Sequence, residues 1–359
     1  MKSGLGGFRV ALVGASTLLG KELLTVLGER QFPFSQLLKM EVEVAEEAEP
    51  ETPILDLSEP VYEAPAGDDA AEADLDFVFL ATRPRPRPSL LDRIANNGEA
   101  RTAVIDLTGT GHEELPARDW LLSVPPLPGD KLAGWTRGEP PFFASAHPAV
   151  IVISSLLLRL AAHFPIKTAV AQVLCPASEN GPRGIEELQK QTVNLLSFHR
   201  IPTATFGAQL AFNLLPRLSR ARRGGTTPYC DALTDIEARI RRELRQYLGD
   251  RIPLPAVRLV QAPVFFSLAF SLYVETAEPA APEAVGHALA GDRIHVRRFT
   301  EVAPSPVEAT ETGDILVDAV LAESGRPSGL WIWAAADNMR LAAANAVEIA
   351  ENLRGRIRS

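Results

Sequence analysis

The chain has 359 residues, of which 46% are hydrophobic and 23% charged, and this composition is typical of a globular protein large enough for two domains. Its net charge of -9 argues against a nucleic-acid surface, and its longest apolar stretch, residues 149–158, ends at Arg159 and is too short to span a bilayer. Only two cysteines are present, Cys175 and Cys230, and no signal peptide precedes the first predicted strand, so we expect a reduced, cytoplasmic protein.

Strands and helices alternate over about the first 140 residues. A buried-strand pattern at residues 8–13 leads into a loop of small residues, and leucines at helical spacing predict a helix over residues 18–30. Further predicted elements are strands at residues 36–40 and 76–80, a helix at 89–96 and a strand from Thr102. Because parallel strands need crossover helices, this alternation predicts a doubly wound parallel sheet.

The rest of the chain has longer strands without regular helices between them. Predicted amphipathic helices lie at residues 185–198 and 231–248, and predicted strands at 168–174, 256–261, 264–275, 314–323 and 330–335. This pattern is typical of an antiparallel or mixed sheet. A final Ala-rich helix is predicted at residues 342–354, with Gly355 as its stop signal.

A turn between a short apolar strand at Phe142 and an apolar helix is the most informative feature of the sequence. Many acyl-transfer enzymes place a Cys or Ser at such a helix N-terminus, where the helix dipole and free N–H groups lower the pKa of a thiol. Here the turn contains His147 and Pro148. Proline suits the first turn of a helix but is not a nucleophile. The sequence therefore predicts an active-site turn that lacks its nucleophile.

The order of several segments resembles the aspartate-semialdehyde dehydrogenase family over nearly the whole chain. The segments are VALVGASTLLGKELLTVLGERQFP at Val10, VIDLTG at Val104, GIEELQKQT at Gly184, QLAFNLLPRL at Gln209, QAPVFF at Gln261 and ADNMRLAAANAVEIAENL at Ala336. The resemblance implies an α/β protein of amino-acid biosynthesis, with a Rossmann-type doubly wound parallel sheet plus an α+β catalytic and dimerisation domain. The implied dinucleotide-binding domain is residues 1–142 with 338–359, and the implied catalytic and dimerisation domain is residues 143–337.

The family's usual reaction is the reductive dephosphorylation of β-aspartyl phosphate through a cysteine thioester and a hydride from NADPH. By resemblance, the nucleophilic cysteine falls on Pro148, a following glutamine on Cys175, and the arginine that binds the substrate carboxylate on Gln261. Proline cannot form a thioester, and glutamine cannot give the bidentate charged contact of arginine. Covalent chemistry and substrate recognition are therefore expected to be lost together.

Two further catalytic roles are also affected, and one residue is retained. By resemblance, the acid/base histidine falls on Leu268, which cannot move a proton, and a phosphate-binding arginine falls near His112. The glutamate that contacts the substrate amine matches Glu243. We therefore expect that the thioester mechanism is lost.

Two kinds of function remain open. The first is a non-catalytic homodimeric binding or assembly protein, with the apolar segments at Gly184 and Gln209 in its interface and hetero-association with an active paralogue as a further alternative. The second is an NAD(P)-dependent oxidoreductase that acts on another substrate without a cysteine. Hydride transfer would need a proton donor, and neither His147 nor Tyr273 is a strong candidate.

The predicted dinucleotide-binding residues are Gly14, Ala15, Ser16, Thr17, Leu18, Leu19, Gly20 and Asn338. The middle glycine of the family's Gly-x-x-Gly-x-x-Gly pattern, which lets the backbone approach a pyrophosphate, is Thr17 in this chain. After the second strand, Glu41 and Glu43 would repel the 2′-phosphate of NADP and could hold the ribose hydroxyls of NAD. We therefore expect weakened binding of NAD or NADP, and the alternative is a scaffold that binds no dinucleotide.

Cys175 offers an alternative route to catalysis, because it ends a predicted strand at a position that the family uses in its active site. A thiol there could act as a relocated nucleophile if its pKa were lowered, whereas an inert buried cysteine is the simpler interpretation. The six histidines show no metal-ligand spacing, and Cys230 has no CxxC partner. No metal site is therefore predicted.

Overall fold

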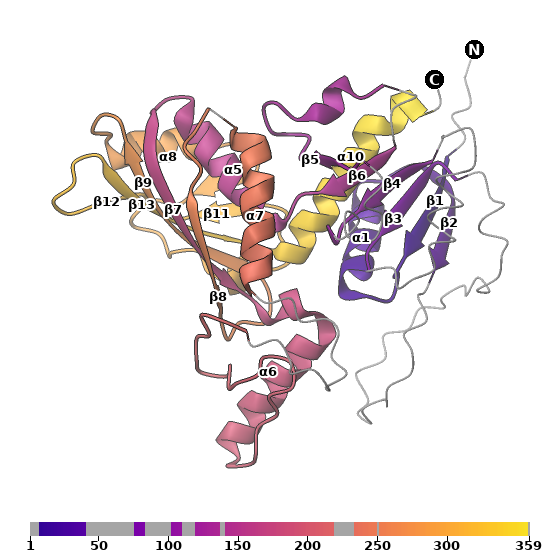
Figure 1. Cartoon of the computed structure of the whole chain (residues 1–359), viewed down its shortest axis with the longest axis horizontal. Coiled ribbons are helices and arrows are strands. Elements are labelled where there is room, and N and C mark those ends of the chain that lie inside the picture. The colour runs from indigo at the N-terminus through magenta and orange to yellow at the C-terminus, as the bar shows by residue number, and fades with distance from the viewer. Residues whose placement is uncertain are drawn as a thin grey trace. The chain divides into compact units, whose positions relative to one another are not determined.

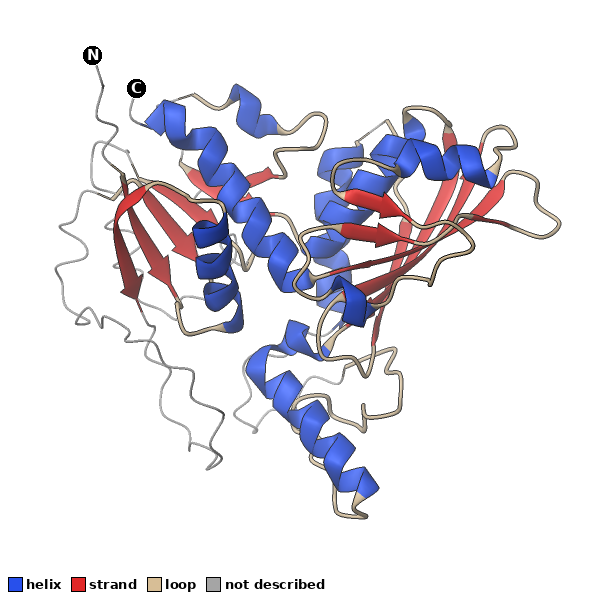
Figure 2. Ribbon diagram, turned by 180° about the vertical axis from the view of Figure 1, so that it is seen from behind, coloured by secondary structure: helices blue, strands red, loops and turns tan. Residues whose placement is uncertain are grey.

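The computed structural model describes residues 7–40, 75–82, 102–109, 119–136, 141–218, 233–249 and 251–357. It divides into two compact units (Figures 1 and 2). Unit 1 comprises Met1–Ser123, Lys131–Ser145 and Ala346–Ser359, and unit 2 comprises Val124–Asp130 and Ala146–Asn345. The predicted helix at residues 89–96 lies outside the described residues, as do His112, Glu41 and Glu43. Among the helices that the structure describes, none is long and apolar enough to cross a membrane.

Within the described residues, unit 1 contains a six-stranded sheet in which each pairing is parallel. In spatial order, its strands are β2 (Phe34–Met40), β1 (Phe8–Val13), β3 (Phe77–Leu80), β4 (Ala103–Asp106), β6 (Phe142–Ser145) and β5 (Leu121–Ser123). Every residue of β3 and β4 is buried, as expected for the apolar strands of a parallel sheet that is covered on both faces. The parallel sheet predicted from the alternating pattern is confirmed.

Among the described residues, the helices of unit 1 are α1 (Leu18–Glu29), the 3-10 helix η1 (Lys131–Gly134) and the last part of α10 (Asn338–Ile357). Leu23 and Leu27 are fully buried on α1, which explains why its leucine spacing predicted a helix. Arg30 follows α1 and forms ion pairs with Glu348 and Glu351 of α10, each at 2.9 Å. These partly buried pairs tie the C-terminal helix to α1.

Within the described residues, unit 2 contains a seven-stranded mixed sheet. In spatial order, its strands are β10 (Ile294–Val296), β11 (Ile315–Val317), β13 (Gly329–Ala336), β9 (Leu268–Thr276), β7 (Ile166–Cys175) and β8 (Ala256–Gln261), with β12 (Leu321–Ala322) paired to β13. β7 pairs with β8 in parallel and with β9 antiparallel, so the predicted mixed sheet is confirmed.

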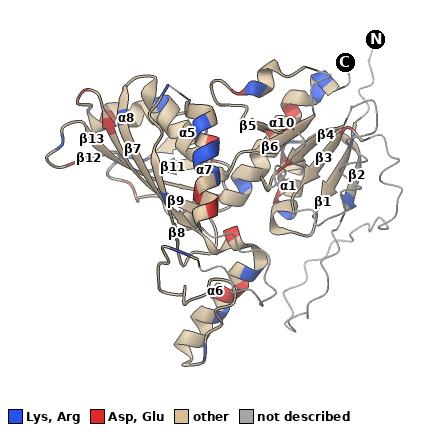
Figure 3. Cartoon of the chain, in the orientation of Figure 1, with Lys and Arg blue, Asp and Glu red and all other residues tan. Residues whose placement is uncertain are grey.

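In the part of unit 2 that the structure describes, the helical elements are α5 (Pro148–Ala161), the 3-10 helix η2 (Ala177–Asn180), α6 (Gly181–Leu196), α7 (Leu233–Leu248), α8 (Pro282–Leu289), α9 (Pro306–Ala309) and the start of α10. α5 packs against α7, α8 and β7, and α7 packs against β8, so that these helices cover one face of the sheet (Figures 1 and 2). Basic and acidic side chains are interspersed along α7 (Figure 3). On the other face of the sheet, Val170 and Trp331 are each 40% exposed.

α6 and residues 197–215, together called the arm, project from the sheet of unit 2 (Figure 1). Gln191 of α6 accepts hydrogen bonds from the backbone N–H groups of Leu210 and Ala211, at 2.6 and 3.0 Å. Glu187 accepts from two further backbone N–H groups of residues 197–215. These two buried side chains therefore hold a segment without regular secondary structure against α6. The exposed large apolar residues of the arm are Val193, Leu196, Phe198, Phe212 and Leu214.

Two predicted strands are wrong in their extent. The strand predicted over residues 264–275 begins only at Leu268, because Ser267 has a φ of 70° and turns the chain there. The strand predicted over residues 314–323 is two strands, β11 and β12. Val317 of β11 pairs with Ala334, and Leu321 of β12 pairs with Trp331, so four steps along one strand match three along the other. One extra residue therefore interrupts the ladder, as in a β-bulge.

The predicted ends of two helices are also wrong. α6 and α10 begin at Gly181 and Asn338, earlier than predicted, and at α10 the Asp337 carboxylate accepts N–H bonds that start the helix. Gly355 does not stop α10, which continues to Ile357. Ile357 is buried, so packing outweighs the helix penalty of glycine, which is about 1 kcal/mol.

Candidate functional site

The predicted active-site turn lies between the end of β6 at Ser145 and the start of α5 at Pro148. His147 is the N-cap of α5, and its ring Nδ1 accepts a hydrogen bond from the backbone N–H of Ala149 at 3.1 Å. Pro148 lies in the first turn, where a helix has N–H groups without intrahelical partners, so its missing N–H costs little. The turn therefore presents a helix cap and a proline.

The second ring nitrogen of His147 faces a carboxylate, because Nε2 lies 3.5 Å from Oε2 of Glu179. Since Nδ1 accepts a hydrogen bond, we assign the proton of the neutral ring to Nε2, from which it points toward Glu179. Glu179 lies in η2, which follows the end of β7 at Cys175. Both ring nitrogens of His147 are therefore used within the protein.

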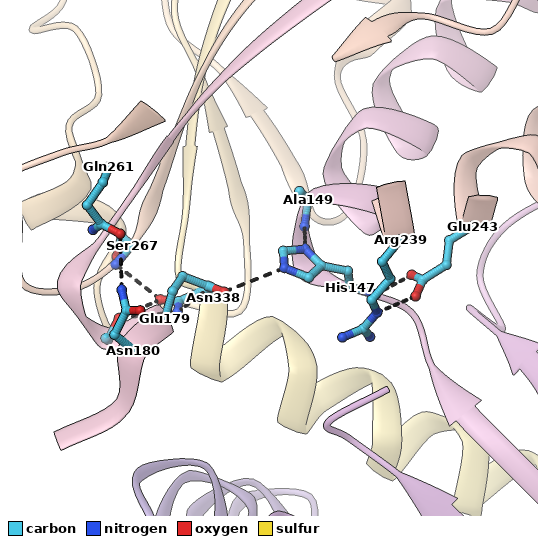
Figure 4. A network of polar contacts seen from close by, with 10 residues as sticks. His147, Ala149, Glu179, Asn180, Arg239, Glu243, Gln261, Ser267 and Asn338 are labelled. Carbon is cyan, nitrogen blue, oxygen red and sulfur yellow. Dashed lines mark hydrogen bonds and ion pairs between the residues drawn. The ribbon is translucent and has the colours of Figure 1, made fainter. Parts of the chain in front are cut away.

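Glu179 is also bound by Asn338, whose Nδ2 donates to Oε1 at 2.8 Å (Figure 4). Burial alone would raise the pKa of Glu179, but the hydrogen bond and electrostatic interaction with His147, the hydrogen bond from Asn338 and the charge of Arg239 hold the pKa below its usual value. The carboxylate is therefore anionic at neutral pH, although only 16% of the side chain is exposed.

Asn338 connects Glu179 to the start of β9. Its Oδ1 accepts a hydrogen bond from the backbone N–H of Ser267 at 3.3 Å, and its Nδ2 also lies 3.2 Å from the hydroxyl of Ser178. The Asn338 side chain is almost fully buried. Asn338, a predicted dinucleotide-binding residue, therefore has both ends of its amide engaged within unit 2.

Gln261 is likewise engaged within the protein. Its Nε2 donates to the backbone carbonyl of Cys175 at 2.8 Å, and its Oε1 accepts from Nδ2 of Asn180 at 3.1 Å. The side chain is fully buried at the end of β8. Gln261 therefore joins the ends of two neighbouring strands and η2, in the place where resemblance puts a substrate-binding arginine.

Cys175 is a buried thiol at the end of β7. Burial raises the pKa of the thiol well above its usual value, and the negative charges of Glu179 and Glu237 raise the pKa further. Because the thiolate is the reactive form, this environment opposes nucleophilic reactivity and favours the interpretation of an inert cysteine.

Glu243 of α7 holds the backbone of the turn. Its Oε2 accepts the backbone N–H of His147 at 2.7 Å, and its Oε1 pairs with Nε of Arg239 at 2.5 Å. Arg239 and Glu243 are four residues apart on α7, a spacing that places them on one face of the helix. The retained glutamate therefore links α7 to the start of α5.

The structure brings several of the predicted site residues together, whereas Leu268 and Tyr273 take no part in the polar network. Leu268 is fully buried, and the Tyr273 ring packs against Trp331 with the ring centroids 5.2 Å apart. The members of the network that the sequence analysis missed are Ser178, Glu179, Asn180, Arg239 and Ser267. A Ser-Glu-Asn triplet just after a predicted strand was the available signal. Within the described ranges, no cluster of side chains could hold a metal ion.

The predicted cofactor loop lies in unit 1, between β1 and α1. Gly14 has a φ of 84°, and a Cβ on Gly20 would lie 2.1 Å from the carbonyl oxygen of Gly14, so both glycines are required by the turn. Thr17 is the N-cap of α1, and its hydroxyl accepts the N–H of Gly20 at 3.0 Å. The same hydroxyl lies 2.8 Å from the carbonyl of Gly14 and 3.1 Å from that of Ala81. The loop keeps the turn that its glycines allow. The Thr17 hydroxyl, however, accepts the N–H of Gly20, which could otherwise bind a phosphate.

The chain is similar to proteins of one family along nearly its whole length. A family model described as semialdehyde dehydrogenase, dimerisation domain, matches residues 157–341. A USG-1 protein homolog from Pseudomonas aeruginosa is 28% identical over 352 residues, which cover 96% of this chain and 97% of that protein. Aspartate-semialdehyde dehydrogenase 2 from Vibrio cholerae is 27% identical over 348 residues, which cover 96% of this chain and 97% of that protein. The solved structure of a probable aspartate-semialdehyde dehydrogenase from Pseudomonas aeruginosa gives a TM-score of 0.78 at 27% identity, covering 97% of this chain and 98% of the other. The chain therefore belongs to the aspartate-semialdehyde dehydrogenase family, with the α/β fold of that family.

Proposed function

We propose that this protein is a non-catalytic homologue of aspartate-semialdehyde dehydrogenase that has lost the thioester mechanism and acts as a dimeric binding or assembly protein. The observation that carries the proposal is Pro148 in the first turn of α5, where resemblance places the nucleophilic cysteine. A proline side chain has no thiol or hydroxyl, so no acyl intermediate can form on it.

The surroundings of Pro148 support the same proposal. Leu268 has no group that could exchange a proton with a substrate. The Gln261 amide is bound to Cys175 and Asn180, and the Glu243 carboxylate is bound to Arg239 and the backbone of His147. The side chains of Gln261 and Glu243 are therefore already held by internal hydrogen bonds that stabilise the fold of unit 2.

A turnover assay tests the proposal directly. The purified protein is given β-aspartyl semialdehyde, phosphate and either NADP or NAD. We expect no formation of reduced dinucleotide above the reagent blank, measured by absorbance at about 340 nm, where only the reduced nicotinamide absorbs. The Vibrio cholerae relative, assayed in parallel, serves as the reference preparation. Robust turnover that Pro148→Ala leaves unchanged would overturn the proposal. Turnover that is abolished by Cys175→Ser would instead indicate a relocated nucleophile.

We propose that this protein binds NAD or NADP more weakly than family members that keep the full Gly-x-x-Gly-x-x-Gly pattern. Gly14 and Gly20 keep the turn that a dinucleotide loop needs, whereas Thr17 places a side chain where the middle glycine would let the backbone approach a pyrophosphate. The retained turn is also the observation that favours the alternative function, an NAD(P)-dependent oxidoreductase on another substrate. Calorimetric titration with NAD and NADP separates the two, because tight stoichiometric binding favours the alternative and an absence of heat counts against it.

The proposed assembly is a homodimer formed through residues 143–337, which we also propose as the dimerisation domain. The match to a dimerisation-domain family and the exposed apolar residues of the arm support it. Hetero-association with an active paralogue is the second proposed assembly. Co-purification of the tagged protein with an untagged active paralogue, expressed in the same cells, tests that association.

A further inference from the structure

We propose that Glu179 is an intramolecular ligand that fills a carboxylate-binding site formed by His147 and Asn338, and that its removal opens this site to a small free carboxylate such as acetate. The inference deepens the proposed function and rests on it, because a site filled by the chain's own carboxylate is closed to an anionic substrate. The region that corresponds to the family's active site is thereby assigned one class of ligand, small carboxylates.

The first argument is the arrangement of the donors. Asn338 Nδ2 donates to Oε1 of Glu179 at 2.8 Å, and His147 Nε2 faces Oε2 at 3.5 Å (Figure 4). The two donors come from different elements, the N-cap of α5 and the first residue of α10, and each addresses a different oxygen. Two donors directed at two oxygens are the arrangement by which proteins recognise carboxylates.

The second argument is that both donors are positioned without help from Glu179. His147 is fixed by the hydrogen bond from the Ala149 N–H to its Nδ1. Because Nδ1 accepts this bond, the ring proton lies on Nε2. Asn338 is fixed by the bond from the Ser267 N–H to its Oδ1. A preorganised pair of donors persists when the side chain between them is shortened, and binding to it costs less ordering.

The third argument is the charge of the surroundings. The positive charge of Arg239 acts on the carboxylate, and the pKa of Glu179 is lowered although burial opposes this shift. The site therefore favours an anion over a neutral group. Part of the Glu179 side chain, 16% of its surface, is exposed to solvent.

The test is chemical rescue of Glu179→Ala by acetate. Thermal unfolding of the variant is measured at neutral pH in sodium acetate and, for comparison, in sodium chloride of equal ionic strength. We expect acetate to raise the melting temperature of Glu179→Ala by about 1–2 °C at a few times its dissociation constant. The rise should saturate with acetate concentration. The wild type should respond equally to the two salts, because its site is filled.

Two matched variants make the result specific. Glu179→Gln keeps the shape of the side chain and should show no acetate-specific rise, because the amide still fills the site. Glu179→Ala/Asn338→Ala lacks one donor and should lose the rise seen in the single variant. Equal responses of Glu179→Ala to acetate and chloride would overturn the inference, as would an acetate-specific rise of the same size in the wild type.

If Glu179→Ala does not accumulate as folded protein, its refolding yield becomes the measurement. Acetate is then expected to restore folded protein, and a failure to do so, or equal recovery in chloride, overturns the inference. The turnover assay keeps the two proposals apart. Acetate rescue together with turnover by the wild type would refute the proposed function alone, whereas neither rescue nor turnover would refute the inference alone.

Discussion

The imidazole of His147 has one nitrogen bound to the Ala149 N–H and the other facing Glu179. A general acid or base must exchange a proton with the substrate through a ring nitrogen within hydrogen-bonding reach. Neither nitrogen of His147 is available in this way without breaking an internal contact. The histidine beside Pro148 is therefore explained by the structure of the turn, and this explanation weighs against its use as the proton donor of an alternative oxidoreductase.

The charge of Glu179 makes stability depend on pH in a defined direction. Its pKa in the folded protein is below the usual value of 4.5, so folding favours the ionised form. This stabilisation is complete above the unfolded pKa and is lost as the pH falls through the folded pKa. The free-energy advantage of the wild type over Glu179→Gln should thus shrink as the pH falls below about 4.5. Denaturant unfolding of both proteins at fixed ionic strength measures the advantage, and an advantage that keeps its size well below pH 4.5 contradicts the prediction.

At the residue scale, the sequence was sufficient to locate the site but not its hydrogen bonds. Pro148 in the first turn of α5 followed from local pattern, because strand, turn and helix signals are short-range. The contact between Glu179 and Asn338 joins residues that are 159 positions apart, and it depends on the tertiary fold. The Ser-Glu-Asn triplet could have marked Glu179 as a candidate site residue, but no single-sequence signal reports its pairing with Asn338.

At the scale of single elements, α1 has a hydroxyl cap in a loop whose glycine pattern is typical of a phosphate site. Thr17→Gly removes the side chain and frees the N–H of Gly20, so we expect tighter binding of NAD or NADP. Thr17→Ser, which keeps the hydroxyl, is the matched control and should bind as the wild type does. Isothermal titration calorimetry measures the three dissociation constants. Unchanged or weaker binding by Thr17→Gly would show that Thr17 is not what limits the loop.

The side-chain amide of Gln191 is one of the two buried groups that hold residues 197–215 of the arm against α6. Gln191 is fully buried, and its side chain accepts the N–H groups of Leu210 and Ala211 while it donates to the carbonyl of Pro202 at 2.8 Å. Gln191→Ala leaves these backbone groups without partners, so we expect a loss of about 2–3 kcal/mol of local stability. Hydrogen exchange at Leu210 and Ala211 should become faster by about 30-fold or more. Lys190→Ala, an exposed neighbour on α6, should leave both rates unchanged, and equal exchange in the two variants would refute the role of Gln191.

The bounds of an element were predicted correctly where a local sequence pattern sets them. They were predicted wrongly where strand pairing or tertiary packing sets them. β8 was predicted to the residue because residues 256–261 form a short apolar-rich strand with clear ends. β11 and β12 were predicted as one strand, because the extra residue between them is defined only by the ladder to β13. Gly355 failed as a stop signal because burial of Ile357 outweighs a local preference.

At the scale of the whole molecule, the exposed apolar residues of the arm bear on assembly. Phe198 is 97% exposed and Leu196 is 69% exposed, which is unusual for large apolar side chains unless they meet a partner. We expect Leu196→Glu/Phe198→Glu to raise the dissociation constant of the homodimer by about 30-fold or more, since two charges would be buried in an apolar contact. Sedimentation equilibrium measures the constant. Phe299→Glu, at a position 81% exposed outside the arm, is the control and should not change it. Equal effects of the two changes would show that the arm is not the interface.

The proline at the start of α5 also determines how the chain could evolve. Its fixed φ already suits the first helical turn, so it restricts the unfolded chain, and replacing it by cysteine should cost about 0.4–1 kcal/mol. Under the proposed loss of the thioester mechanism, a cysteine there would have Leu268 in place of a proton carrier and Gln261 in place of an arginine. Pro148→Cys alone would then lower stability without bringing activity, and a return to the family's reaction would need several changes at once.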